Sequence, residues 1–153
     1  MIYNLSRIKK KKPSTWAVEA ISGASYGFEL NSNGYYESKN KGIDNSYAIC
    51  RVQIHLAKKS NIIFTCINYA ENNYDFGILG RANQALSLSS EVDSSSVYEK
   101  SFKGLSQSSP QTYTYYSGPA GDFFIDVKYR KDSSQSSNND SFQFKVEIQE
   151  VAE

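Results

Sequence analysis

Apolar and polar residues alternate with a period of two over several stretches of this chain. The clearest stretches are residues 46–56, 123–130 and 142–149. A period of two places every second side chain on the same face of an extended strand, whereas a helix repeats every 3.6 residues. Each stretch has one apolar face and one mostly polar face, so each predicts a strand that packs one face against a core.

Shorter segments of similar character lie between polar turns. The segments that favour strands are residues 26–31, 35–38, 61–69, 97–102 and 112–116, and the intervening Asn, Ser, Gly and Pro residues favour turns. One of these turns is predicted at residues 31–34 (NSNG), because Asn-Gly tolerates positive φ. Residues 81–88 predict a short helical turn. About eight or nine short strands without crossover helices predict an all-β fold. We expect a two-sheet antiparallel β-sandwich, jelly-roll-like, with a basic N-terminal arm.

The stretches 46–56 and 61–69 are joined by a short turn that predicts a β-hairpin. A three-residue turn sets Val52 opposite Phe64, Ile54 opposite Ile62, and Cys50 opposite Cys66. Both cysteines then lie on an apolar face, where we interpret them as small buried side chains. A cross-strand disulfide is the alternative. A catalytic thiol is disfavoured, because the only histidine of the sequence, His55, is predicted on the opposite face.

Positive charge gathers at the start of the chain. The formal net charge is +1, yet residues 1–12 hold five basic side chains and no acid. This divides the chain into a basic arm, 1–15, and a sandwich domain, 16–153. The arm predicts either a solvated tail or, as our hypothesis for its function, an anchor that docks on an acidic partner protein. The basic residues are Arg7, Lys9, Lys10, Lys11 and Lys12.

Several classes of partner and compartment are disfavoured by the same sequence. Nucleic acid is disfavoured because no aromatic residue is interleaved with the lysines to stack on bases. No apolar run approaches the roughly 20 residues that a membrane helix needs. The basic cluster is not followed by the apolar stretch of a secretory signal. We therefore expect cytosolic synthesis, with the two cysteines reduced.

Acids and amides cluster in three places along the chain. Asp and Asn are turn residues, so each cluster first predicts a turn, with calcium binding or direct ligand contact as alternatives. None has the spacing of a calcium loop, and we predict no metal site and no cofactor. The clusters are Glu37, Asn40, Asp44 and Asn45; Glu71, Asn72, Asn73 and Asp75; and Asp132, Asn138, Asn139 and Asp140.

Tyrosines near these clusters suggest a surface that binds glycans. A sugar ring has an apolar face and a polar rim, which an aromatic ring and nearby amides or carboxylates can hold. The candidates are Tyr35, Tyr36, Asn72, Tyr74 and Asp75. Glu29 and Glu37 are a carboxylate pair of the kind that glycosidases use. Since nothing in the sequence shows that the pair converges in a pocket, we do not expect an enzyme.

Six segments resemble the β-sandwich parts of virion structural proteins from bacteriophages that infect gut bacteria. They are residues 26–31 (YGFELN), 34–42 (GYYESKNKG), 45–52 (NSYAICRV), 67–78 (INYAENNYDFGI), 124–132 (FIDVKYRKD) and 139–146 (NDSFQFKV). The general layout is also similar to that of jelly-roll carbohydrate-binding modules.

The phage resemblance implies a non-enzymatic particle component, either a head fibre, a capsid-decorating protein or a tail-associated protein. Its partners would be other virion proteins, further copies of itself and host surface glycans, and its location would be the virion after synthesis in the host cytoplasm. The resemblance to binding modules implies the alternative, a carbohydrate-binding module of a secreted or cell-surface protein.

Overall fold

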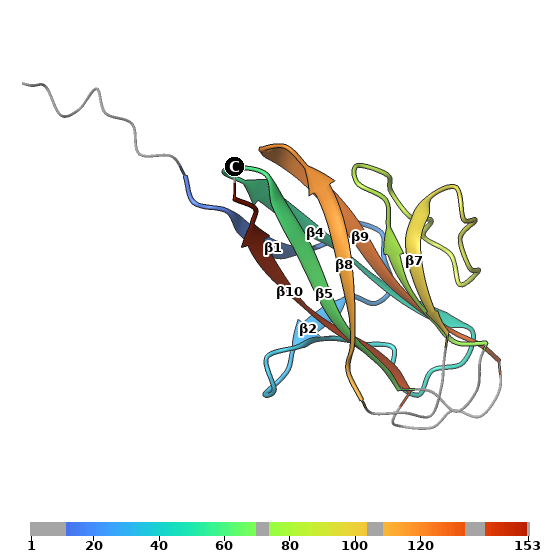
Figure 1. The fold of residues 1–153 in the computed structure, drawn as a ribbon. Coiled ribbons are helices and arrows are strands. Elements are labelled where there is room, and N and C mark those ends of the chain that lie inside the picture. The colour runs from blue at the N-terminus through green and yellow to red at the C-terminus, as the bar shows by residue number, and fades with distance from the viewer. Residues whose placement is uncertain (1–11, 70–73, 104–108, 134–139, 153) are drawn as a thin grey trace, which may run out of the picture.

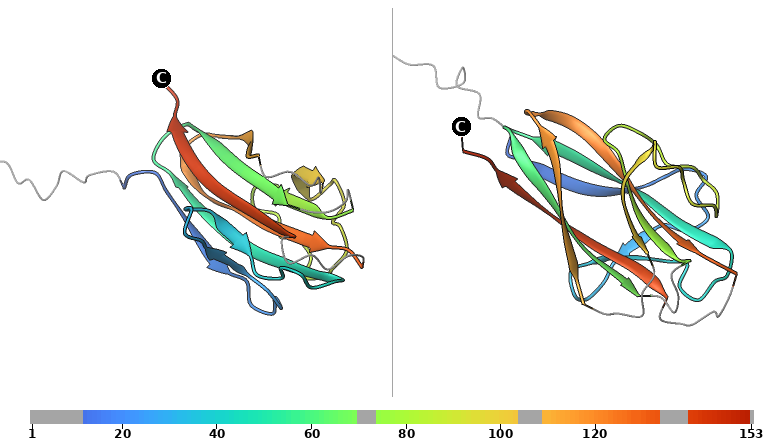
Figure 2. Two further views of the ribbon diagram at one scale, coloured as in Figure 1. Left: turned by 90° about the horizontal axis from the view of Figure 1, so that it is seen from below. Right: turned by 45° about the vertical axis from the view of Figure 1, so that its right-hand side comes forward.

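The alternating stretches form strands whose apolar rows meet between two five-stranded antiparallel sheets (Figures 1 and 2). The computed structural model describes residues 12–69, 74–103, 109–133 and 140–152. Sheet A has the order β1 (Thr15–Ala20), β4 (Ser46–Leu56), β9 (Gly121–Lys131), β6 (Phe76–Gly80) and β7 (Tyr98–Lys103). Sheet B has the order β2 (Phe28–Leu30), β3 (Tyr36–Ser38), β10 (Ser141–Glu150), β5 (Ser60–Tyr69) and β8 (Gln111–Gly118). The predicted all-β, two-sheet sandwich is confirmed.

Most consecutive strands lie in different sheets. Only β2–β3 and β6–β7 are sequence neighbours that pair within one sheet. The chain therefore crosses repeatedly between the layers, as in a jelly roll. Within the described part of the chain, there is no helix with the length and apolar character needed to cross a membrane. The predicted boundary at residue 15 stays a prediction, because residues 1–11 lie outside the described residues.

The core lies between the sheets and follows the alternation closely. Every second residue of β4, β5, β9 and β10 is buried there, and the aromatic rings of β10 pack against their neighbours. Phe144, for example, stacks on Tyr36 with ring centroids 5.7 Å apart. Burying one large apolar side chain stabilises the fold by about 1.5–3 kcal/mol before entropy is subtracted. The fully enclosed side chains include Val52, Ile62, Phe64, Ile125, Val127, Tyr129, Phe142 and Phe144.

The predicted hairpin between residues 46–56 and 61–69 is wrong. β4 pairs with β1 and β9 in sheet A, whereas β5 pairs with β10 and β8 in sheet B. The turn at residues 57–59 passes from one sheet to the other. The apolar faces of both strands were predicted correctly, but they contact the same core from opposite sheets. Cys50 and Cys66 are buried and free, and burial raises the pKa of both thiols.

The predicted helical turn at residues 81–88 is also wrong. Ala82 and Asn83 form a turn in which Asn83 has φ of 60°, and Leu86 lies in an irregular segment. The Asn83 N–H donates to the Phe124 carbonyl at 2.9 Å, which attaches the segment to β9. The backbone is therefore bonded to the neighbouring sheet, and this replaces the local hydrogen bonds of a helix.

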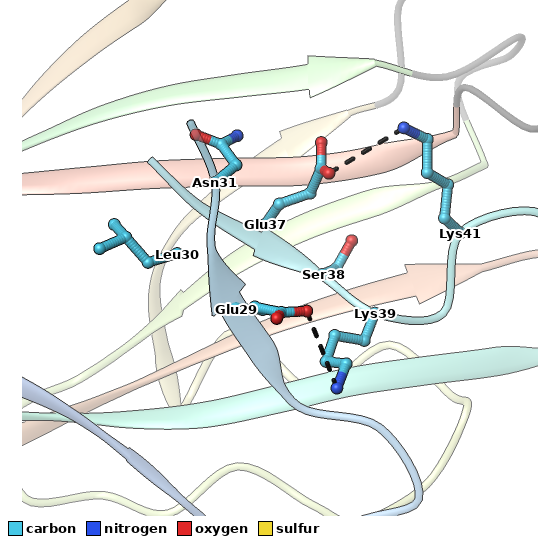
Figure 3. A pocket seen from close by; sticks show the side chains of 7 residues that line it. All are labelled: Glu29, Leu30, Asn31, Glu37, Ser38, Lys39 and Lys41. Atoms are coloured by element: carbon cyan, nitrogen blue, oxygen red, sulfur yellow. Dashed lines mark ion pairs between the residues drawn. The ribbon is translucent and has the colours of Figure 1, made fainter. Parts of the chain in front are cut away.

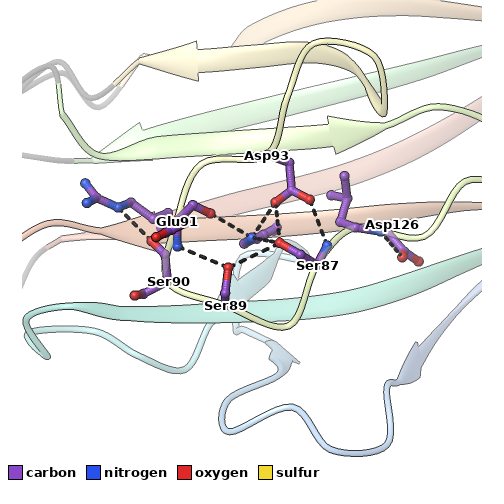
Figure 4. Close-up of polar contacts among 9 residues, drawn as sticks. Ser87, Ser89, Ser90, Glu91, Asp93 and Asp126 are labelled. Carbon is purple, nitrogen blue, oxygen red and sulfur yellow. Dashed lines mark hydrogen bonds and ion pairs between the residues drawn. The ribbon is translucent and has the colours of Figure 1, made fainter.

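The segment 81–97 covers the outer face of sheet A. Leu86 packs there on Tyr47, Ile49 and Ile78, which form a second small core. Three polar side chains of β9 hold the segment from beneath. Asp126 accepts from the Leu86 N–H at 2.9 Å. Lys128 donates to Ser87 Oγ and to the Glu91 carbonyl, and it forms an ion pair with Asp93. Arg130 donates to the Ser90 carbonyl (Figure 4).

Candidate functional site

The outer face of sheet B is open, in contrast to that of sheet A. On sheet A, Ile49 and Lys128 point outward and yet are 0% exposed. On sheet B, the outward side chains of β5, β10 and the edge strand β8 are exposed or half-buried, so they can contact a ligand. They are Asn61, Ile63, Thr65 and Ile67 of β5, Gln143, Lys145, Glu147 and Gln149 of β10, and Thr112 and Thr114 of β8.

A hollow of about 410 Å³ adjoins this face at the β2–β3 hairpin. We call it the β2–β3 hollow. Leu30 contributes an apolar side chain that is 56% exposed, and the remaining lining is polar and charged. The lining residues are Glu29, Leu30, Asn31, Glu37, Ser38, Lys39 and Lys41 (Figure 3).

Asn31 fixes the shape of the hairpin. Its side-chain oxygen accepts from the backbone N–H groups of Asn33 and Tyr35, each at 3.0 Å. Its Nδ2 donates to Gln143 Oε1 at 2.8 Å, which connects the hollow to the outer row of β10. Gly34 has φ of 85°, the left-handed conformation that the turn requires. The predicted Asn-Gly turn is therefore present, and the hydrogen bonds of Asn31 fix the side of the hollow that the turn forms.

The charged residues of the hollow form two ion pairs at its rim. Glu29 and Glu37 are direct cross-strand partners on β2 and β3. Lys39 Nζ lies 3.9 Å from Glu29 Oε2, and Lys41 Nζ lies 4.0 Å from Glu37 Oε1 (Figure 3). The Glu29 side chain is 72% exposed. Exposed pairs of this kind contribute little stability. Because their side chains are exposed or half-buried, these carboxylates and ammonium groups are accessible to ligand hydroxyls.

The structure separates the two adjacent tyrosines of the predicted glycan site. Tyr35 lies at the open face, with Lys145 Nζ 5.0 Å from its ring centroid. Tyr36 points into the sandwich, where it stacks on Phe144 and meets Trp16 edge-on at 5.8 Å. Of the two rings, Tyr35 can serve as a platform for a sugar, and Tyr36 belongs to the core.

The other predicted site residues do not join Tyr35. Tyr74 is 65% exposed, and its carbonyl accepts from Arg130 on the outer side of sheet A. Asp75 is fully buried, and its Oδ1 accepts from the Asp132 N–H at 2.7 Å. Asn72 lies outside the described residues. So do the basic residues of the arm except Lys12, which is exposed.

Four aspartates from the three acidic clusters meet around one buried lysine. Lys131, at the end of β9, is fully buried. Burial of an ammonium group is costly unless carboxylates compensate it, and the described residues place four beside Lys131. Their oxygen atoms lie at 3.2 Å (Asp132), 3.5 Å (Asp140), 3.6 Å (Asp44) and 4.0 Å (Asp75) from Nζ. The three clusters lie far apart in the sequence, and no sequence pattern marks Lys131 as their common partner.

Within the described residues, Lys131 and these four aspartates form an ion-pair network. Among the residues that the structure describes, no group of three or more His, Cys, Asp or Glu side chains is arranged to hold a metal ion. Residues 138 and 139 of the third cluster lie outside that part of the chain. The network joins the loop before β4, the start of β6, the end of β9 and the start of β10, so it stabilises one end of the sandwich.

No protein-family profile and no curated protein matches the chain. Two solved β-sandwich binding domains are similar in outline. The K1 cleaved adhesin domain of Lys-gingipain from Porphyromonas gingivalis W83 shares 12% identity, with a TM-score of 0.45 over 90% of this chain and 91% of that one. The low-affinity xylan-binding module CBM86 of Roseburia intestinalis shares 11% identity, with a TM-score of 0.37 over 89% and 97%. Values this low say nothing about a shared ligand.

Proposed function

We propose that this chain is a non-catalytic carbohydrate-binding domain that holds a polysaccharide along the outer face of sheet B and in the β2–β3 hollow. The observation that carries the proposal is the asymmetry of the sandwich. The segment 81–97 covers sheet A, while the outward side chains of β5, β8 and β10 stay accessible. A strand face of this kind offers a polysaccharide an extended row of contacts.

The chemistry of the open face suits neutral sugar units. Tyr35 supplies an aromatic ring for the apolar face of a sugar, and Gln143, Glu147 and Gln149 supply amide and carboxylate groups for its hydroxyls. Together with Lys145, these β10 residues are spaced by two along the strand, so their side chains repeat about every 6.6 Å on one face. An extended saccharide lying along β10 would meet one polar side chain after another.

We propose binding without turnover. A glycosidase needs one carboxyl whose pKa is raised by burial, so that it can donate a proton to the leaving group. Glu29 is the more exposed member of the only cross-strand glutamate pair in the hollow, and each glutamate lies beside a lysine. An exposed carboxylate next to an ammonium group is poorly suited to that role, whereas it is well suited to accept hydrogen bonds from sugar hydroxyls.

Affinity electrophoresis through gels that contain neutral plant or bacterial polysaccharides tests the proposal. We expect at least one polysaccharide to retard the wild-type protein and Tyr35→Ala to weaken binding tenfold or more. Tyr74→Ala is the matched control, since Tyr74 is an exposed tyrosine outside the hollow, and it should migrate like wild type. Equal retardation of wild type and Tyr35→Ala, or no retardation by any polysaccharide, would contradict the proposal.

The particle role implied by the phage resemblance stays a prediction, together with virion partner proteins, self-association and location in a virion. The binding-module alternative is favoured here because its site can be traced in the described residues. No described contact bears on attachment to a particle, and the arm that would provide it lies almost wholly outside the described residues.

A further inference from the structure

A second hollow lies on the sheet A side of the sandwich. It has a volume of about 430 Å³, which falls within the range of small-ligand pockets. We call it the β4-entry hollow, because Ser46 and Tyr47 at the start of β4 form part of its lining. The other lining residues are Ser25, Tyr26, Ile43, Asp44, Asn45, Leu88, Ser89 and Ser90.

The β4-entry hollow gathers apolar side chains that the fold leaves in solvent. Among the described residues, five large hydrophobic side chains are exposed. Two of them, Ile43 at 37% and Leu88 at 46%, line this one hollow beside the half-buried ring of Tyr26. A single exposed Leu needs no explanation, whereas an apolar patch with a polar rim indicates a binding surface.

Polar groups of fixed orientation surround the apolar patch. Asp44 is held by Lys131, whose Nζ lies 3.6 Å from its Oδ1, and the Asp44 side chain is still 38% exposed. Asn45, next to it, donates its backbone N–H to the Asp132 carbonyl and has φ of 51°. The Lys131 network therefore holds the Asp44 carboxylate at the hollow, and Asn45 beside it is exposed.

The side of the hollow formed by Leu88, Ser89 and Ser90 is fixed by hydrogen bonds from side chains of β9. Lys128 and Arg130 bind the segment on either side of Leu88, at Ser87 Oγ (3.2 Å) and at the Ser90 carbonyl (2.8 Å) (Figure 4). Leu88 also rests on the backbone at Gly23, where a Cβ would lie 3.5 Å from Leu88 Cδ1. A wall that is ordered before binding lowers the entropy cost of holding a ligand.

We infer that the β4-entry hollow is a second carbohydrate site, and that it takes a single terminal sugar unit. The apolar face of the sugar would rest on Leu88, Ile43 and Tyr26, and its hydroxyls would meet Asp44 and Asn45. The inference shares the ligand class of the proposed function but uses the opposite side of the sandwich. Two sites that face apart would let one domain bridge two glycan chains and bind them with higher avidity.

Saturation-transfer difference NMR with methyl glycosides of a hexose, a 6-deoxyhexose and a pentose tests the inference. We expect transfer to at least one glycoside from wild type, reduced at least fivefold by Leu88→Ser. Val92→Ser is the matched control, because Val92 is 38% exposed on the same segment but does not line the hollow. It should behave like wild type.

The two proposals fail separately in these experiments. No transfer to any of the three glycosides, or equal transfer with Leu88→Ser and Val92→Ser, would overturn the second site while leaving polysaccharide retardation intact. If no polysaccharide retards the wild-type protein, while saturation transfer is observed and is reduced by Leu88→Ser, only the open-face proposal is overturned.

Discussion

At the scale of single residues, burial controls the ionisation of Tyr115. Its side chain is 5% exposed in the core. Desolvation is the main cause that raises the pKa of Tyr115 to about 12, from an ordinary value of 10, and Glu99 adds to the effect. The unfolded chain releases this proton near pH 10, whereas the folded chain retains it. Stability is therefore complete below pH 10 and falls as the pH rises from about 10 to 12.

The Tyr115→Phe variant tests this assignment. Between pH 10 and 12, we expect the free energy of unfolding of Tyr115→Phe to fall less than that of wild type, by an amount on the order of 2 kcal/mol. Urea titrations at pH 8, 10 and 11.5 measure the effect for both proteins. Parallel losses in wild type and variant would show that Tyr115 does not contribute.

Lys131 is the residue whose loss should disturb the sandwich most. Lys131→Met leaves four carboxylates facing one another without the ammonium group between them. Removing one partner from a buried ion pair costs about 3–5 kcal/mol. We expect a loss of that size by urea unfolding at neutral pH, and a loss below 0.5 kcal/mol for exposed Lys103→Met. Similar losses in both variants would contradict the account.

Individual residues were predictable only where their neighbours in sequence decide their role. The Asn-Gly turn at residues 33–34 is of this kind. The Lys131 network is not, because its carboxylates come from segments almost a hundred residues apart that meet only in the folded chain. The same limit explains Tyr36, since alternation shows that Tyr35 and Tyr36 face opposite ways but not which of them faces the core.

At the scale of elements, the two sheets approach each other closely at Gly77 of β6. A Cβ at this position would lie 2.2 Å from two ring carbons of Phe142, which is fully buried on β10. The ring therefore occupies the space that any larger residue would need. A glycine inside a strand often marks such an approach.

Gly77→Ala should accordingly destabilise the protein by about 1–3 kcal/mol, the usual cost of overpacking a core. Gly27→Ala is the control, because a Cβ there would have no neighbour within 4 Å. The difference in urea midpoint between the two variants measures the effect. Equal midpoints would mean that Phe142 moves away without cost.

Strands were easier to predict than their partners. Alternation identified β4, β5, β9 and β10 and the apolar face of each, because one face must be buried whichever strand lies beside it. Alternation could not distinguish a hairpin from a connection that crosses between the sheets. In both arrangements, the apolar rows of β4 and β5 are buried in the same core. The helical turn at residues 81–88 failed because the backbone of that segment bonds to β9.

At the scale of the whole molecule, the two outer faces of the sandwich differ in how far they are covered. On sheet A, the segment 81–97 covers the outward residues and is fixed by Asp126, Lys128 and Arg130. On sheet B, the outward rows remain accessible. The sequence could not predict which face is open, because a Ser-rich segment without strand character gives no sign of where it packs. The sites argued above follow from this asymmetry.

An NMR titration tests the central claim most directly. ¹⁵N-labelled protein is titrated with a fragment of a polysaccharide that retards the protein in the gel, and the shifts of the backbone amides are mapped. The central claim predicts shifts that concentrate on β3, β5, β8 and β10 and on the turn at residues 31–35, with β9 unaffected and with any shift in β4 limited to the residues that line the β4-entry hollow. Shifts confined to sheet A and the segment 81–97, with sheet B unchanged, would contradict it.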